Sequence, residues 1–364
     1  MADLSHHINA KSKARHPSPL KDIIKFMGYD GMISFAGGNT NAWAKVVGLL
    51  CEDNDFVIVE EFTYPSAQAL WIPLGVKAVP VSADAEGMLA TNLEHLLQNW
   101  DQRERGARRP RVTSTETTFK PKPVSEFLDT LVPTFLSMDT QGRVIRLESF
   151  SKTLFPGLRL GYFVANAVFT ERLLRATEVE TQDPAGLSQA FVLGLLRKWG
   201  VDGYLTWLQN LQFQYRTRRD WVLDAFDEHF TLLPAENSPT PQAQGIVACV
   251  KSQGNGRLKP VFSFVDPRAG MFLWCKFYFD GVQRFHEIES TGKSKDPEQD
   301  FANELWKAWA TELVLLTPGS YYHAWQGPDK MTTKARGAEL RTAHFRFSFA
   351  TPTLYLWREG EYEY

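Results

Sequence analysis

The chain has 364 residues, 43% of them hydrophobic, and a formal net charge of −2 at pH 7. This length and hydrophobic content are enough for a sizeable core and allow two domains. The balanced charge argues against nucleic acid as a partner. No run of about 18 apolar residues occurs, so we expect no membrane-spanning helix.

Helix and strand signals alternate in the N-terminal part of the chain. Residues 41–52 have apolar side chains at helical spacing, which predicts a helix. Phe56–Val59 is a short apolar run typical of a strand buried on both faces, and Val76–Val81 is a second predicted strand. Alternation of this kind indicates an α/β architecture.

The middle of the chain begins with a predicted strand at Arg143–Leu147. Two long helical patterns follow, over residues 169–199 and 204–230. The cluster Gln182-Asp183-Pro184 is expected to break the first of them.

The character of the sequence changes at Leu233. Prolines, an asparagine and a glycine between residues 234 and 245 mark a connection. Strand-like runs follow at Ile246–Val250 and Met271–Phe279, and a helix is predicted around Asp300–Leu313. This pattern predicts a second, smaller α+β domain from residue 233 to the end.

The cysteines and the first residues bear on the compartment. Cys51, Cys249 and Cys275 lie far apart, which argues against a disulfide framework and against a zinc site. The segment 1–19 is polar and lacks the apolar core of a signal peptide. We therefore expect a soluble cytoplasmic protein without a metal site.

The most informative motif lies between residues 149 and 162. Ser149-Phe150-Ser151-Lys152 is followed, seven residues after the lysine, by Arg159 within Pro156-Gly157-Leu158-Arg159-Leu160-Gly161-Tyr162. The amine can form a Schiff base, the guanidinium can hold phosphate bidentately, and the hydroxyls supply further donors. The set suits an aldehyde cofactor that carries a phosphate. A short serine-lysine motif alone more often lies on a solvated surface. The longer motif, which also includes Arg159 and its glycines, is much harder to reach by chance.

With this motif the chain resembles the class I/II aminotransferases of pyridoxal-phosphate fold type I, in the fungal aromatic-amino-acid and 2-aminoadipate branch. The resemblance implies an α/β fold, with a mostly parallel sheet between helices and a smaller α+β domain. It places the large domain at residues 35–232 and the small domain at 1–34 with 233–364. It also implies pyridoxal 5'-phosphate as cofactor, amino acids and 2-oxo acids as substrates, and a homodimer.

The resemblance assigns roles to the motif and to residues near the N-terminus. Lys152 would carry the cofactor as a Schiff base, Arg159 would hold its phosphate, and Ser149 and Ser151 would donate on the phosphate side. Gly37-Gly38-Asn39-Thr40 opens the predicted helix, where exposed N–H groups attract anions, although such a sequence is usually only a helix cap. In the family these residues cradle the phosphate, so Asn39 and Thr40 are assigned there.

Two further residues complete the expected site. Tyr64 follows the strand at Phe56–Val59, and the resemblance makes it the ring that stacks on the cofactor; otherwise it would be a half-buried turn tyrosine. Arg346 stands between Phe345 and Phe347, and the resemblance makes it the fork for the substrate carboxylate. A surface arginine on an edge strand is the alternative, and Arg341 is a nearby competitor.

The chain departs from the family in two apparent internal deletions. One falls between Gly38 and Asn39, and the other between Arg111 and Lys120. The second removes the acid that pairs with the pyridine nitrogen and makes the ring an electron sink. Glu116 is the only acid nearby, and a loop glutamate is more often solvated.

Two main hypotheses follow. The first is an aminotransferase that moves the amino group of an aromatic or related amino acid to a 2-oxo acid, in a secondary-metabolite pathway. The second is a catalytically impaired or non-catalytic member of the fold that lacks the acid. A transcription regulator on this fold would carry an N-terminal DNA-binding domain, and only 33 residues precede Ser34.

Overall fold

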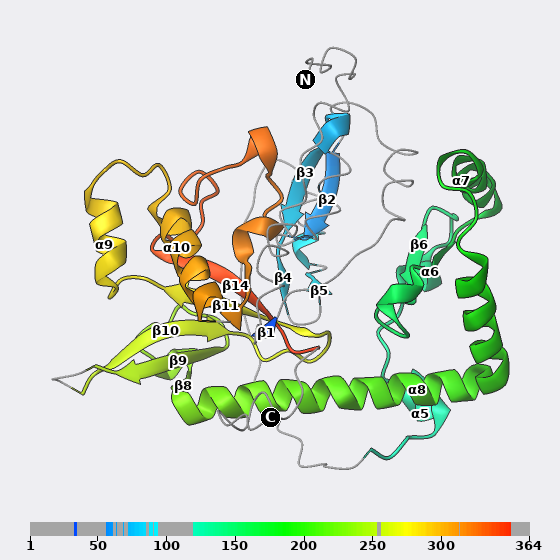
Figure 1. Cartoon of the computed structure of the whole chain (residues 1–364), viewed down its shortest axis with the longest axis horizontal. Coiled ribbons are helices and arrows are strands. Elements are labelled where there is room, and N and C mark those ends of the chain that lie inside the picture. The colour runs from blue at the N-terminus through cyan, green and yellow to red at the C-terminus, as the bar shows by residue number, and fades with distance from the viewer. Residues whose placement is uncertain are drawn as a thin grey trace. The chain divides into compact units, whose positions relative to one another are not determined.

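The computed structural model describes the chain in parts (Figure 1). The described residues are 33–34, 56–60, 63, 68, 72–84, 87–89, 91–93, 119–252, 256–312 and 314–350. Asn39, Thr40, Tyr64 and Glu116 lie outside them, as does the predicted helix at 41–52. The roles expected of these residues stay predictions, and so do the two deletions.

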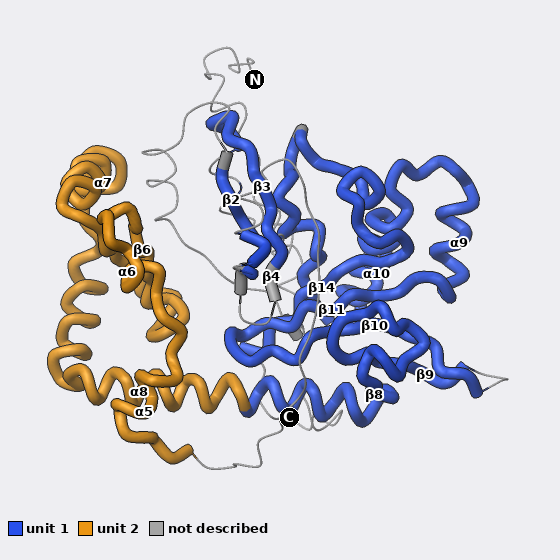
Figure 2. The backbone as a smooth tube through the Cα atoms, turned by 180° about the vertical axis from the view of Figure 1, so that it is seen from behind, with its two compact units in different colours: residues 1–37, 56–114, 217–364 blue, residues 38–55, 115–216 orange. Residues whose placement is uncertain are grey.

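The chain divides into two compact units (Figure 2). Unit 1 comprises residues 1–37, 56–114 and 217–364, and unit 2 comprises residues 38–55 and 115–216. The expected division into a large domain at 35–232 and a small domain around it remains a prediction.

A six-stranded sheet forms the centre of unit 1. Its order is β13-β14-β11-β10-β9-β8, and neighbouring strands run antiparallel. The predicted strands at Ile246–Val250 and Met271–Phe279 are confirmed, as β9 and β11. The strands are β8 (Thr231–Pro234), β9 (Ile246–Lys251), β10 (Leu258–Phe264), β11 (Phe272–Tyr278), β13 (Thr317–Pro318) and β14 (Thr342–Ser348).

Aromatic rings pack against one face of this sheet. Phe226, from helix α8 (Gly186–His229), contacts the rings of Phe262 and Phe347 at centroid distances of 5.0 and 5.7 Å. Trp309 contacts Phe345 at 4.8 Å. Edge-to-face contacts at these distances are favourable, so the aromatic face fixes α8 and the helix of Trp309 on the sheet.

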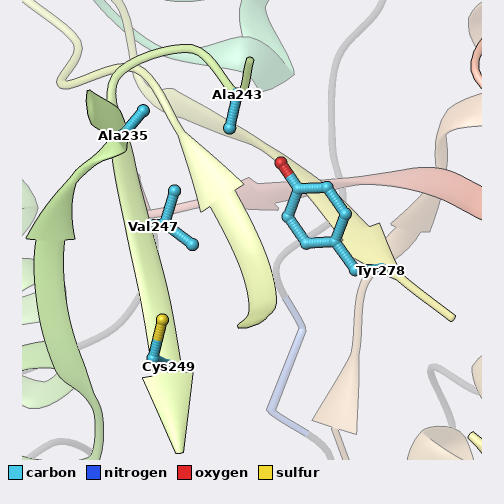
Figure 3. Packing of buried hydrophobic residues seen from close by; sticks show 5 residues of the cluster. All are labelled: Ala235, Ala243, Val247, Cys249 and Tyr278. Carbon is cyan, nitrogen blue, oxygen red and sulfur yellow. The ribbon is translucent and has the colours of Figure 1, made fainter. Parts of the chain in front are cut away.

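The opposite face of the sheet buries a smaller cluster. Ala235, Ala243, Val247, Cys249 and Tyr278 pack together there (Figure 3). The hydroxyl of Tyr278 lies 2.7 Å from that of Ser263, so the polar end of the ring has a partner. Burial raises the pKa of Tyr278 to about 12, which keeps the phenol neutral.

Along the chain, two helices of unit 1 follow strand β11. They are α9 (Gln283–Ser290) and α10 (Pro297–Thr311). The carboxylate of Asp296 caps α10 by accepting from the N–H of Gln299 at 3.4 Å, and Pro297 is at the first helical position. The helix predicted around Asp300–Leu313 is therefore confirmed, but it begins earlier because the cap and the proline define its start.

Short strand pairs complete unit 1. β2 (Phe56–Glu60) and β3 (Lys77–Val81) run parallel, which confirms both predicted strands. β1 (Ile33–Ser34) runs parallel to β12 (Val314–Leu315). The remaining pair, β4 (Ala83–Asp84) with β5 (Gly87–Met88), is antiparallel.

The described part of unit 2 consists of helices and the hairpin of β6 (Arg146–Ser149) and β7 (Gly161–Val164). The hairpin pairs β6 with β7, so the strand predicted at Arg143–Leu147 begins and ends later. The predicted breaker is confirmed, because α7 (Ala167–Glu180) ends before it and α8 begins after it. The other helices are α5 (Val124–Leu128) and α6 (Phe135–Met138).

Helix α8 contributes residues to both units. Gly200 has φ 62° and ψ −170°, outside the helical region, so α8 consists of two helices joined at this residue. Among the described residues, none of the helices combines the length and apolar character that a membrane span requires.

Candidate active site

The β6–β7 hairpin carries the lysine motif. Ser149 pairs with Gly161, and one step further the N–H of Phe150 donates to the carbonyl of Leu160 at 3.0 Å. This bond closes residues 151–159 into a loop. Lys152 therefore lies on one leg of the loop and Arg159 on the other, which brings two residues seven positions apart into one short segment.

The two serines stabilise the start of this loop. Ser149 Oγ donates to Ser151 Oγ at 2.9 Å and accepts from the backbone N–H of Ser151 at 3.1 Å. Ser151 is buried, whereas the next residue, Lys152, is exposed. The turn thus keeps the hydroxyls close together and directs the lysine outward.

Arg159 ends a short 3₁₀ helix, η4 (Pro156–Leu158). Its backbone is left-handed, with φ 51° and ψ 35°, and its N–H donates to the carbonyl of Pro156 at 3.4 Å. A left-handed conformation is uncommon for a residue with a side chain, so the loop imposes it. Arg159 is exposed and lies on the second leg of the loop.

The side chains of this loop fit an aldehyde that carries a phosphate. Lys152 is exposed, and its amine is of the nucleophile type that reacts with a carbonyl group. Arg159 offers a planar, permanently charged fork, and the O–H of Ser151 adds a donor, because that of Ser149 is donated to Ser151. The structure thus brings together Ser149, Ser151, Lys152 and Arg159 in unit 2.

Arg346 lies in β14 of unit 1. Its side chain is 5% exposed, and its guanidinium carbon lies 3.9 Å from the centroid of the Phe272 ring and 4.6 Å from that of Tyr322. β14 pairs with β11 on one side and β13 on the other. Arg346 is therefore buried in an inner strand, which excludes the alternative of a surface arginine on an edge strand.

The competitor Arg341 has a different environment. Its guanidinium is exposed and forms ion pairs with Glu289 at 3.1 Å and Asp280 at 3.3 Å. These carboxylates hold the pKa of Arg341 above its usual value. The charge of Arg341 is thus matched on the surface, whereas Arg346 is buried in the sheet.

A buried histidine follows Tyr322 in the chain. Burial, together with the charges of Arg336, His344 and Lys330, lowers the pKa of the adjacent His323 to about 2. His323 is therefore neutral at any physiological pH.

Comparisons with known proteins identify the family. No family model matches the chain. An aromatic amino acid aminotransferase of Schizosaccharomyces pombe is 32% identical over 375 aligned positions, which cover 90% of this chain and 69% of the relative.

The chain belongs to the fungal aromatic amino acid aminotransferases.

Other relatives agree with this family. A second Schizosaccharomyces pombe aromatic amino acid aminotransferase is 31% identical over 74% of this chain. An L-tyrosine:2-oxoglutarate aminotransferase of Serpula lacrymans is 28% identical over 80% of this chain and 60% of the relative. The chain spans 63% and 57% of the length of two Schizosaccharomyces pombe relatives.

Solved structures identify the fold of this chain. An aminotransferase of Candida albicans superimposes with a TM-score of 0.63 at 23% identity, over 98% of this chain and 96% of that one. The alpha-aminoadipate aminotransferase of Thermus thermophilus gives 0.62 at 17% identity, over 96% and 94%. The chain therefore has the α/β fold of pyridoxal-phosphate fold type I, as the resemblance implied.

Gly161 allows the hairpin to close. A Cβ atom at this position would lie 2.5 Å from the carbonyl oxygen of Glu148, closer than such atoms approach. We expect Gly161→Ala to destabilise the hairpin by about 1–3 kcal/mol, the usual cost of overpacking. Hydrogen exchange of the peptide that spans β6 and β7 would measure this loss.

Gly157 is the matched control for that substitution. It lies in the same loop, and nothing lies within 4 Å of the Cβ position that alanine would add. Gly157→Ala should leave the exchange of the hairpin unchanged. Equal exchange in the two variants would contradict the steric argument.

Sequence reasoning missed three residues that hold the expected site. Phe272 and Tyr322 enclose the guanidinium of Arg346, and Trp207 donates its indole N–H to the carbonyl of Thr153, next to Lys152. For Tyr322 the sequence gives a weak signal, the paired tyrosines of the loop Pro318-Gly319-Ser320-Tyr321-Tyr322. No local pattern signals the contact of Trp207, because its partner is 54 residues away in the sequence.

Proposed function

We propose that this chain is a pyridoxal-phosphate-dependent aminotransferase that moves an amino group from an aromatic or related amino acid to a 2-oxo acid. The observation that carries the proposal is the closed loop with Lys152 on one leg and Arg159 on the other. A relative named as an L-tyrosine:2-oxoglutarate aminotransferase supports the substrate classes.

The loop residues have separate tasks in this proposal. When bound, the cofactor supplies an aldehyde for covalent attachment and a ring that accepts electrons. Lys152 would hold the cofactor through its Nζ, and its amine would carry the substrate's α-proton. Arg159 and the hydroxyl of Ser151 would hold the phosphate, and Ser149 would keep Ser151 in place through its own hydrogen bond.

Arg346 binds the carboxylate of the amino acid in this proposal. The rings of Phe272 and Tyr322 contact the guanidinium and hold its plane in one orientation. A planar fork that is held in place binds a carboxylate with two parallel hydrogen bonds and loses little entropy. Such a fork also orients the Cα–H bond for proton transfer.

The remaining expectations belong to the same proposal. Asn39 and Thr40 bind the phosphate, Tyr64 stacks on the cofactor ring, and the large domain spans 35–232. The protein acts as a homodimer in the cytoplasm, within a secondary-metabolite pathway. The resemblance to the family supports these assignments.

The test is a spectrum followed by a donor screen. The purified chain is mixed with pyridoxal 5'-phosphate, and the absorbance band of a Schiff base is recorded. Tyrosine, phenylalanine, lysine and 2-aminoadipate are then offered with 2-oxoglutarate, and glutamate is measured. Glutamate formation from an aromatic donor supports the proposal, and absence of the band overturns it.

One outcome would favour the second hypothesis. The sequence between Arg111 and Lys120 offers only Glu116 as an acid. A chain that forms the band but yields no glutamate from any donor would be a cofactor-binding protein without turnover. The missing acid would account for this result, because a neutral pyridine stabilises a carbanion poorly.

A further inference from the structure

A hydrogen bond joins helix α8 to the loop that carries Lys152. The indole N–H of Trp207 donates to the backbone carbonyl of Thr153 at 2.6 Å. Thr153 is the residue after Lys152, so the bond acts directly beside the lysine. Both residues belong to unit 2 (Figure 2).

The position of Trp207 is itself fixed by the helix. Trp199 and Trp207 stack with ring centroids 5.5 Å apart and an interplanar angle of 27°. Gly203 lies one turn before Trp207 in the second helix of α8, and the non-helical Gly200 separates both from Trp199. A Cβ at Gly203 would lie 2.9 Å from Trp199 Cβ, so glycine leaves the space in which the two indoles meet.

Other contacts hold the loop near the same place. The N–H of Leu154 donates to the carbonyl of Phe150 at 2.8 Å, and the side chain of Leu154 is buried. The ring of Phe155 contacts that of Phe191 in α8 edge to face at 6.2 Å. The residues after Lys152 are thus fastened to the turn and to α8, while Lys152 itself is exposed.

We propose that Trp207 is a positioning residue, which fixes the Lys152 backbone through the carbonyl of Thr153 and so sets where the lysine amine meets an aldehyde. This inference rests on the proposed function. Tryptophan suits the task because indole has a single donor and a large rigid ring. The stacked ring fixes the direction of the N–H, and the N–H fixes the loop.

The experiment removes the donor and keeps the ring. In Trp207→Phe, an aromatic ring can still stack on Trp199, but no N–H faces Thr153. The pyridoxal 5'-phosphate concentration for half-saturation of Lys152 is measured by borohydride reduction and mass spectrometry. We expect it to rise about fivefold, the factor of one neutral hydrogen bond. The pH midpoint of the absorbance band should shift, and amide exchange of residues 150–160 should become faster.

Trp199→Phe is the matched control, because it changes the stacking partner and leaves the Trp207 donor in place. Because the stacked ring orients the N–H without replacing it, this variant should shift the half-saturation, the pH midpoint and the loop exchange less than Trp207→Phe does. If Trp207→Phe does not fold, Trp207→benzothienylalanine keeps the bicyclic shape and replaces only the N–H by sulfur.

The outcomes separate this inference from the proposed function. A folded Trp207 variant with the parent's half-saturation, pH midpoint and loop exchange overturns the inference. If the parent itself forms no adduct at Lys152, the proposed function is wrong. In that case the exchange of residues 150–160, measured without cofactor, still decides whether Trp207 holds the loop.

Discussion

Lys152→Ala is expected to abolish the pyridoxyl adduct and to reduce amino-group transfer by at least about a hundredfold, because the lysine is both nucleophile and proton carrier. Alanine removes the only atom of this side chain that can attack an aldehyde. The fold should be retained, since the Lys152 side chain is exposed. Borohydride reduction followed by peptide mass spectrometry measures the adduct, and glutamate formation measures the transfer.

Two comparisons make the Lys152 result specific. Lys198 is an exposed lysine of α8 in the same unit, and Lys198→Ala should keep both adduct and activity. Added methylamine should restore part of the proton transfer to Lys152→Ala, since it supplies a mobile amine. A parent-like adduct in Lys152→Ala, carried by another lysine, would refute the assignment of the nucleophile.

The lysine loop could be predicted from sequence because its geometry is local. Strand β6 ends at Ser149, whose hydroxyl accepts a hydrogen bond from the N–H of Ser151, and Gly161 begins the returning strand. All these contacts fall within about one hairpin, where sequence spacing and spatial distance agree. The left-handed backbone of Arg159 was not predictable, because arginine has no preference for it.

Residues that support the site from a distance could not be predicted. The contact of Trp207 with Thr153 depends on how α8 packs on the hairpin, and a tryptophan at helical spacing looks like any core residue. Arg341 and Arg346 lie five residues apart in the sequence, yet one is exposed and the other buried. What separates them is the sheet order, which places β14 between β11 and β13. That order joins strands distant in the chain and leaves no local signal.

Arg346→Lys is expected to reduce kcat/KM for an amino acid by about a hundredfold, since a hydrogen bond to a charged group contributes about 1.5–3 kcal/mol. The charge is kept, but lysine cannot donate two parallel bonds to one carboxylate. Its ammonium also loses the planar contact that the guanidinium makes with the Phe272 and Tyr322 rings. The loss should appear mainly in KM, while the adduct at Lys152 forms as in the parent.

Arg341→Lys provides the matched control, because the same exchange is made at an exposed arginine whose charge is paired with Glu289 and Asp280. It should leave kcat/KM unchanged. A substrate analogue without a carboxylate distinguishes loss of the carboxylate contact from a change in packing. Tyramine has no carboxylate, so its affinity should be equally weak in the parent and in Arg346→Lys. If Arg346→Lys instead lowered the affinity for tyramine as much as that for tyrosine, Arg346 would act through the packing of the pocket and not through the carboxylate. Its aromatic enclosure would then serve the stability of the sheet, and the carboxylate fork would have to be sought elsewhere.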